Sequence, residues 1–168
     1  ETWMMEKEDL ATELTMIFLR MDGIGDLAIN LVVLAIIPAL GEELLFRGVF
    51  QKIFIDWTRN IHIGIIITAF LFSAFHFQFF TFLPRFALGI FLGYLFVWSK
   101  SIWLPILGHF VNNSSAVLIY YFSSEESKNE ILTSTEMSSS IPIILVSVVI
   151  FSALCILIFR VERNLLKI

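Results

Sequence analysis

Two adjacent carboxylates and an arginine lie inside a largely apolar run, residues 27–54, in the order Glu42, Glu43 and Arg47. A charged side chain in hydrocarbon costs from about 3 to more than 10 kcal/mol, so it persists there only when it is paired, hydrated or functional. On a helix, Glu43 and Arg47 share a face at i and i+4 and can form an ion pair. Glu42 points about 100° away from Glu43. Glu42 is therefore the carboxylate that remains available for a partner other than Arg47.

Two of the three histidines also lie in apolar runs, where polar side chains are costly. Phe72 and His76 are spaced at i and i+4, as are His109 and Asn113, so each pair shares a helical face. A single intramembrane histidine is explained equally well by helix packing. Polar side chains on three separate apolar segments instead indicate that they converge with Glu42 on one hydrated cavity.

These residue types suit the hydrolysis of an amide bond. A carboxylate beside an imidazole can activate a water molecule as a general base, and a second imidazole with a carboxamide can donate hydrogen bonds to a developing oxyanion. No serine, threonine or cysteine has a comparable claim to be a nucleophile. Ser73 lies only three residues before His76, and a single serine in a helix usually bonds the helix backbone.

The composition indicates an integral membrane protein. The 168 residues are 58% hydrophobic and only 15% charged, with a mean hydropathy of +0.87, far from the values of soluble domains. The 11 lysines and arginines are outnumbered by 15 aspartates and glutamates and form no basic patch, which argues against nucleic acid as a partner. The chain begins at Glu1, so we expect a piece of a longer protein. Residues 2–13 are acidic and polar and do not resemble a signal peptide.

We predict an all-α fold, a polytopic transmembrane helix bundle of about five spans with an amino-terminal amphipathic helix. The amphipathic helix, residues 4–20, places on one face the apolar residues Leu10, Leu14, Ile17 and Phe18, which favours a position on the membrane surface. The predicted spans are residues 27–55, 61–80, 85–98, 102–122 and 141–159, with an exposed serine-rich loop at 123–140. The chain thus divides into residues 1–25, a surface helix and linker, and residues 26–168, a single transmembrane catalytic core.

Smaller features add detail to this plan. Asp26 is expected to cap the first span, and Pro38 with Gly41 predicts a kink or interruption just ahead of the acidic pair. Gly89 and Gly93 have the spacing that lets helices approach closely. Arg85 lies near a turn and is interpreted as a snorkelling side chain. Basic residues number six on one side of the predicted spans and four on the other, which predicts a cytoplasmic carboxyl terminus.

Three motifs occur in order on successive apolar segments: Glu42-Glu43-x-x-x-Arg47, Phe72-x-x-x-His76 and His109-x-x-x-Asn113. Together they resemble the signature motifs of the CPBP family, which contains the CAAX proteases and bacteriocin-processing enzymes and is also called the Abi or type II CAAX prenyl endopeptidase family. The resemblance covers about residues 39–115. One of these motifs alone would be weak evidence, whereas three in the same order are specific.

The resemblance implies a multi-helix intramembrane endopeptidase, whose eukaryotic relatives remove the last three residues from prenylated CAAX proteins. The expected partners are therefore membrane lipid and a peptide or lipidated protein substrate. By this similarity, Glu42 and His76 would activate the attacking water, and His109 with Asn113 would form the oxyanion site. An integral, multi-pass protein is expected, in the plasma (inner) membrane if the source is prokaryotic.

The resemblance also implies roles for the remaining motif positions and leaves the question of a metal open. Glu43, Arg47 and Phe72 are expected to support the reacting groups structurally. The family is commonly labelled metalloprotease, but the chain has no His-Glu-x-x-His motif. A divalent metal such as zinc and a metal-free mechanism are equally serious alternatives, because either can use the same two imidazoles and carboxylate. The ligands of such a metal would be Glu42, His76 and His109.

Two further hypotheses come from other functional classes. One is a non-catalytic membrane protein on the same scaffold that serves bacteriocin self-immunity or partner scaffolding. The intact set of polar motif residues counts against this hypothesis. The other is a small transporter in which Glu42 and the histidines relay protons. The chain shows no inverted repeat of broken helices, which counts against transport.

Overall fold

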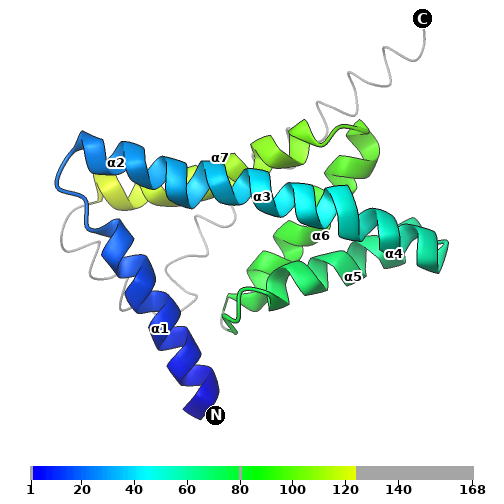
Figure 1. The fold of residues 1–168 in the computed structure, drawn as a ribbon, viewed down its shortest axis with the longest axis horizontal. Coiled ribbons are helices and arrows are strands. Elements are labelled where there is room, and N and C mark those ends of the chain that lie inside the picture. The colour runs from blue at the N-terminus through cyan, green and yellow to red at the C-terminus, as the bar shows by residue number, and fades with distance from the viewer. Residues whose placement is uncertain (1, 80, 124–168) are drawn as a thin grey trace, which may run out of the picture. The chain divides into compact units, whose positions relative to one another are not determined.

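The computed structural model describes residues 2–79 and 81–123, and all the regular elements in these ranges are helices (Figure 1). The chain divides into two compact units, Glu1–Tyr121 and Phe122–Ile168, and almost all described residues belong to the first. The all-α fold class is confirmed for this part. The predicted span at 141–159 and nearly all of the loop at 123–140 lie outside the described residues.

Helix α1, Thr2–Leu19, corresponds to the predicted amphipathic helix. Its apolar residues Leu10, Leu14 and Ile17 are about half exposed, at 49%, 51% and 60%. The buried side chain of Asn30 donates a hydrogen bond to the backbone carbonyl of Phe18 and so joins the end of α1 to the next helix. An exposed apolar face is what a helix on a membrane surface would present, and this location remains a prediction.

The second helix runs without a break over Ile24–Thr58, 35 residues, and carries the acidic pair. It comprises α2 (Ile24–Asn30), a π-helical segment (Leu31–Ile36), α3 (Ile37–Leu45), a second π-helical segment (Phe46–Phe50) and α4 (Gln51–Thr58). The helix is not interrupted at Pro38, and the irregularity predicted there takes the form of a π-helical turn. The wider π-helical turn that ends just before the proline accommodates it while the helix continues.

The start of this helix also differs from the prediction. Gly23 occupies the N-cap position, and Asp26 lies inside the first turn. The Asp26 carboxylate accepts hydrogen bonds from the backbone N–H groups of Asp22 and Gly23, at 3.0 and 3.2 Å. Asp26 therefore stabilises the helix start from within, because a carboxylate in the first turn can reach back to backbone donors that lack a helical partner.

Helices α5 (Ile61–Ala74) and α6 (Phe82–Ser99) pack against each other, and glycines on α6 allow the close approach. A Cβ atom at Gly93 would lie 2.8 Å from Cγ2 of Ile65, and one at Gly89 would lie 3.0 Å from Cβ of Ala69. The predicted small-residue contact is confirmed. Helix α7, Trp103–Phe122, has nearly the bounds of the fourth predicted span, and its crossing of the membrane remains a prediction.

Helix α5 ends at Ala74, whereas the sequence pattern predicted helix to residue 80. Phe77 has a left-handed backbone, φ 53°, which an α-helix cannot continue through. The hydroxyl of Ser73 donates to the backbone carbonyl of Phe82 at 2.7 Å and closes the turn into α6. His76 therefore lies in the α5–α6 turn, not on a helical face.

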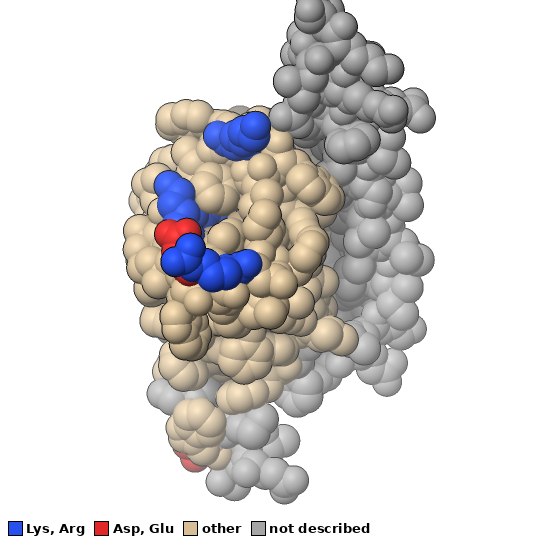
Figure 2. All heavy atoms as spheres, turned by 90° about the vertical axis from the view of Figure 1, so that its right-hand side faces the viewer, with Lys and Arg blue, Asp and Glu red and all other residues tan. Residues whose placement is uncertain are grey.

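Among the described helices, Ile24–Thr58 and Phe82–Ser99 are long and apolar enough to cross a membrane, and Ile61–Ala74 is apolar but shorter. The start of α5, which follows directly on α4, lies beside the second half of α6, because the ring of His62 bonds the hydroxyl of Tyr94 at 2.7 Å. Arg59 and Lys100, both left-handed, follow α4 and α6 at this end. Figure 2 shows lysine and arginine side chains gathered on the face that the end of α4 presents.

Candidate active site

A fully buried ion pair lies at the centre of the helix packing. Nη1 of Arg47 bonds Oε1 of Glu43 at 2.7 Å, and neither side chain has any exposed surface, which confirms the pairing predicted from their spacing. Nη2 of Arg47 donates to the backbone carbonyl of Gly89 on α6 at 3.1 Å. The guanidinium carbon also lies 4.7 Å from the centre of the Phe72 ring on α5. The pair thus connects three helices and leaves no net charge of its own.

His109 on α7 is bound to the same carboxylate. Its Nδ1 lies 2.8 Å from Oε1 of Glu43, and its side chain is 4% exposed. A carboxylate that accepts from Arg47 has no hydrogen to give, so Nδ1 of His109 carries the proton of this hydrogen bond. The other ring nitrogen, Nε2, is turned to Glu42 and lies 3.9 Å from its Oε2. Glu43 therefore fixes the orientation of His109 as well as compensating Arg47.

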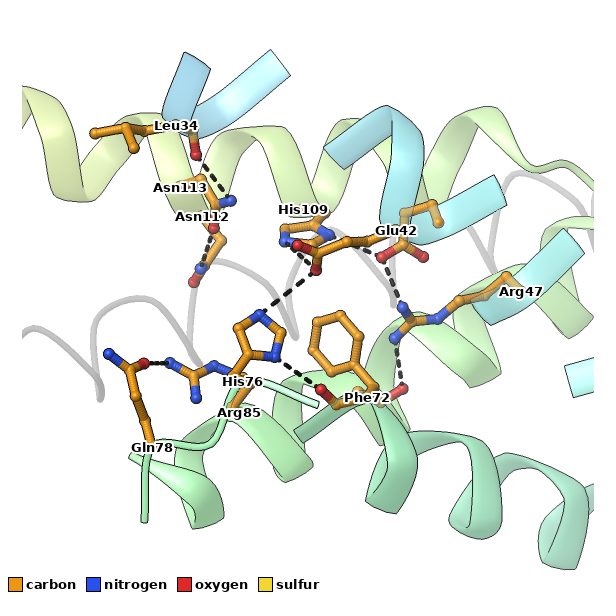
Figure 3. A network of polar contacts seen from close by, with 12 residues as sticks. Leu34, Glu42, Arg47, Phe72, His76, Gln78, Arg85, His109, Asn112 and Asn113 are labelled. Atoms are coloured by element: carbon orange, nitrogen blue, oxygen red, sulfur yellow. Dashed lines mark hydrogen bonds and ion pairs between the residues drawn. The ribbon is translucent and has the colours of Figure 1, made fainter. Parts of the chain in front are cut away.

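His76 is oriented by a backbone group. Its Nδ1 lies 2.8 Å from the carbonyl oxygen of Phe72, so Nδ1 is the donor and Nε2 is left to face Glu42, whose Oε2 is 3.7 Å away (Figure 3). The Phe72 ring makes edge contacts with the rings of both His76 and His109, at centroid separations of 5.3 and 5.7 Å. Phe72 thus lies between the two imidazoles and restricts both.

Three potential hydrogen-bond acceptors therefore meet at one point: Oε2 of Glu42 and the Nε2 atoms of His76 and His109. When both imidazoles are neutral, none of these atoms carries a hydrogen, and separations of 3.7 and 3.9 Å are too long for direct hydrogen bonds. In the described part of the chain, Oε2 of Glu42 is buried without a hydrogen-bond partner. A water molecule placed among these atoms would donate its two O–H groups to two of the three acceptors.

Two of the separations among the same three side chains are slightly wider than those of ligands on a tetrahedral zinc ion. Ligands at 2.0 to 2.2 Å from a tetrahedral zinc lie about 3.3 to 3.6 Å apart, less than the separations from Glu42 to His76 and His109. Within residues 2–79 and 81–123, no group of three or more His, Cys, Asp and Glu side chains is arranged to hold a metal ion. Zinc binding by Glu42, His76 and His109 therefore stays a prediction, and removal of metal tests it.

Asn113, one turn after His109, bonds the long helix instead of the acidic centre. Its Nδ2 donates to the backbone carbonyl of Leu34 at 3.2 Å, and its Oδ1 accepts from the side chain of Asn112 at 3.2 Å (Figure 3). Leu34 precedes Pro38 by four residues, and proline has no N–H to offer that carbonyl. Asn113 therefore joins α7 to the long helix through this carbonyl, and the bond uses one of its two amide hydrogens.

The sequence pattern missed one buried polar residue, Gln51. Its side chain is fully buried, and Nε2 donates to the backbone carbonyl of Gly93 at 3.0 Å. This contact lies one helical turn beyond that of Arg47 with Gly89. The spacing in the sequence could have indicated this contact. Gln51 follows Arg47 by four residues, just as Gly93 follows Gly89, and each polar side chain is 42 residues from its glycine. The long helix therefore donates two side-chain hydrogen bonds, one turn apart, to glycine carbonyls on α6.

Comparison with known proteins gives one family match and one curated relative. Residues 24–115 match the family model described as Type II CAAX prenyl endopeptidase Rce1-like, a range that contains every candidate site residue. The relative is Uncharacterized protein YpbD of Bacillus subtilis (strain 168), which is 29% identical over 86 residues. The alignment covers 49% of this chain and 41% of YpbD, so the chain spans less than half the length of that relative. No solved structure matches the chain.

Proposed function

Because the chain belongs to the type II CAAX prenyl endopeptidase Rce1-like family, a family of membrane-embedded proteases, we propose that it is a multi-pass intramembrane endopeptidase. Its reaction would be hydrolysis of a peptide bond near a membrane-embedded or lipidated carboxyl terminus. The observation that carries the proposal is the convergence of Oε2 of Glu42 with Nε2 of His76 and of His109. For a prokaryotic chain, the inner membrane is the proposed location.

In the proposed reaction, a water molecule is held by Glu42 and His76 and attacks the scissile carbonyl. The water donates one hydrogen to Oε2 of Glu42 and the other to Nε2 of His76. Glu42 takes the proton as the new bond forms and delivers it to the leaving amine as the tetrahedral intermediate collapses. His76 holds the water in line, because its own Nδ1 is fixed by the carbonyl of Phe72.

The negative oxygen of the tetrahedral intermediate would be stabilised by His109 and Asn113. Since Nδ1–H of His109 is given to Glu43, Nε2 can donate only when the ring carries a proton on both nitrogens. The buried carboxylate of Glu43 offsets the charge of that form. The second amide hydrogen of Asn113 is the other proposed donor. Removing one such donor typically lowers turnover about 100- to 1,000-fold.

An apolar groove beside the site supports a hydrophobic substrate. It has a volume of about 270 Å³ and lies between α3 and α7. Its lining includes Ala39, one turn before the acidic pair, and Ile106, one turn before His109. An apolar side chain or lipid chain attached next to the scissile bond could occupy this groove while the bond faces Glu42. Burying such a chain contributes about 25 cal/mol per Å² of apolar surface.

The proposal is tested with full-length protein in lipid nanodiscs and a fluorescent, farnesylated CAAX peptide as the probe. We expect Glu42→Gln and His76→Ala each to lower the cleavage rate at least 100-fold, since each removes a group that holds or deprotonates the water. The matched control is Asp56→Asn, an exposed carboxylate on the same long helix. Activity of Glu42→Gln equal to that of the parent protein would refute the assignment. Comparison of protein termini in membranes with and without the gene would identify natural substrates.

A further inference from the structure

A guanidinium group borders the site, and the proposed mechanism does not use it. Arg85 lies in the first turn of α6, one turn before Gly89, whose carbonyl accepts from Arg47. Residues 85, 89 and 93 therefore share the α6 face that packs on the long helix. Arg85 is at the end of that face nearest the turn that carries His76. Figure 3 shows its guanidinium on the His76 side of the site, bonded to the amide oxygen of Gln78.

The site opens on this same side. The side chains of Glu42 and His76 are 29% and 28% exposed, whereas that of His109 is 4% exposed. A substrate therefore reaches the reacting water past Glu42 and His76. Arg85 lies close enough for its positive charge to act on both of these groups. An incoming peptide thus meets a fixed cation next to the atoms that would cleave it.

The chemistry of Arg85 favours an anionic ligand. A guanidinium presents five N–H donors in a planar fork that matches both oxygens of a carboxylate. One of the contacts that Arg85 makes, the bond to Gln78, is to a neutral amide oxygen. Charge-assisted, bidentate bonds to a carboxylate are about twice as strong as bonds to a neutral acceptor, so an entering carboxylate can take the place of the amide. A free carboxyl terminus is the anionic group that every peptide chain possesses, whatever its side chains.

We propose that Arg85 binds the free carboxyl terminus of the substrate and thereby sets the distance between that terminus and the bond that is cleaved. This inference rests on the proposed peptidase function and names the residue that determines its specificity. It replaces the interpretation of Arg85 as a snorkelling side chain. A different role must be separated from it by experiment: the bond from Arg85 to Gln78 could only hold the turn that carries His76.

The test uses two probes that differ in one group, a farnesylated CAAX peptide ending in a free carboxylate and the same peptide ending in a carboxamide. Cleavage of both is measured with the parent protein, Arg85→Gln, Arg85→Lys and the matched control Arg59→Gln, an exposed arginine at the far end of α5. We expect the parent and Arg59→Gln to prefer the carboxylate peptide about 10- to 100-fold in kcat/KM. Arg85→Gln should abolish this preference mainly through KM, and Arg85→Lys should restore part of it.

Two results would overturn the proposal. If the parent protein cleaves both peptides equally well, the carboxylate is not recognised. If Arg85→Gln lowers cleavage of both peptides by the same factor through kcat, Arg85 positions the His76 turn and does not bind substrate. In that case replacement of Gln78 by Leu should reproduce the effect of Arg85→Gln.

A binding measurement separates failure of this inference from failure of the proposed function. Both peptides are titrated against Glu42→Gln, which retains Arg85 and cannot activate the water, and against the double variant with Arg85→Gln. Tighter binding of the carboxylate peptide that is lost in the double variant supports the inference even if the parent protein cleaves neither probe. Equal binding of the two peptides, or binding of neither, overturns it even if cleavage is observed.

Discussion

The buried pair of Glu43 and Arg47 allows a quantitative prediction about stability. Both side chains have no exposed surface, so solvent does not screen the charge that is left when one partner is removed. Removing one member of such a pair costs about 3 to 5 kcal/mol, mostly because the other charge stays buried and unpaired. We therefore expect Glu43→Gln and Arg47→Met each to lower the free energy of unfolding by at least about 3 kcal/mol.

The double variant Glu43→Gln with Arg47→Met removes both charges, so its cost should be far below the sum of the two single costs. We expect a coupling energy of about 2 to 3 kcal/mol between the two positions. The assay is unfolding of the purified protein in mixed micelles, followed by tryptophan fluorescence. Asp56→Asn serves as the control and should change stability by less than about 0.5 kcal/mol. Single costs that add to within about 0.5 kcal/mol would refute the energetic importance of the pair.

Glu43 also binds His109, and this contact gives the same variants a second measurable effect. In Glu43→Gln the amide oxygen can still accept from Nδ1 of His109, but it no longer offsets a positive charge on the ring. We therefore expect the remaining folded protein to cleave the farnesylated probe at least tenfold more slowly. Full activity in the folded fraction would show that His109 does not act in its doubly protonated form.

Three further predictions concern packing, backbone hydrogen bonding and metal. Gly64→Ala should destabilise the protein by about 1 to 3 kcal/mol, because the new Cβ would lie 2.8 Å from the backbone nitrogen of Ile55. Gly41→Ala is the control: its Cβ would meet nothing within 4 Å, so this change should be neutral or stabilising. Asn113→Ala should cost about 1 to 3 kcal/mol by leaving the Leu34 carbonyl without its donor, and adding Pro38→Ala should recover part of this cost. Treatment of active protein with a chelator should leave cleavage unchanged, and loss of activity restored by zinc would contradict the metal-free reaction.

Local patterns in the sequence were sufficient for several elements. The apolar runs predicted the long helix, α6 and α7 to within a few residues, because burial in lipid or protein requires continuous apolar helices. The spacing of Glu43 and Arg47 predicted their ion pair, since i and i+4 positions meet on any helix. The predicted helix end was wrong where the backbone conformation of single residues determines the structure. The end of α5 depends on Phe77 and on the bond of Ser73 to Phe82, neither of which has a periodic signal.

The sequence by itself determined which polar residues lie within apolar segments and that they come from three separate segments. An unpaired polar group inside an apolar segment is too costly to be incidental. Only the tertiary structure decided how these residues are oriented. Glu43 meets His109 across 66 residues, and the carbonyl of Phe72 fixes the proton of His76. These contacts depend on how helices pack and where one helix ends, and helical spacing within a segment contains no information about either.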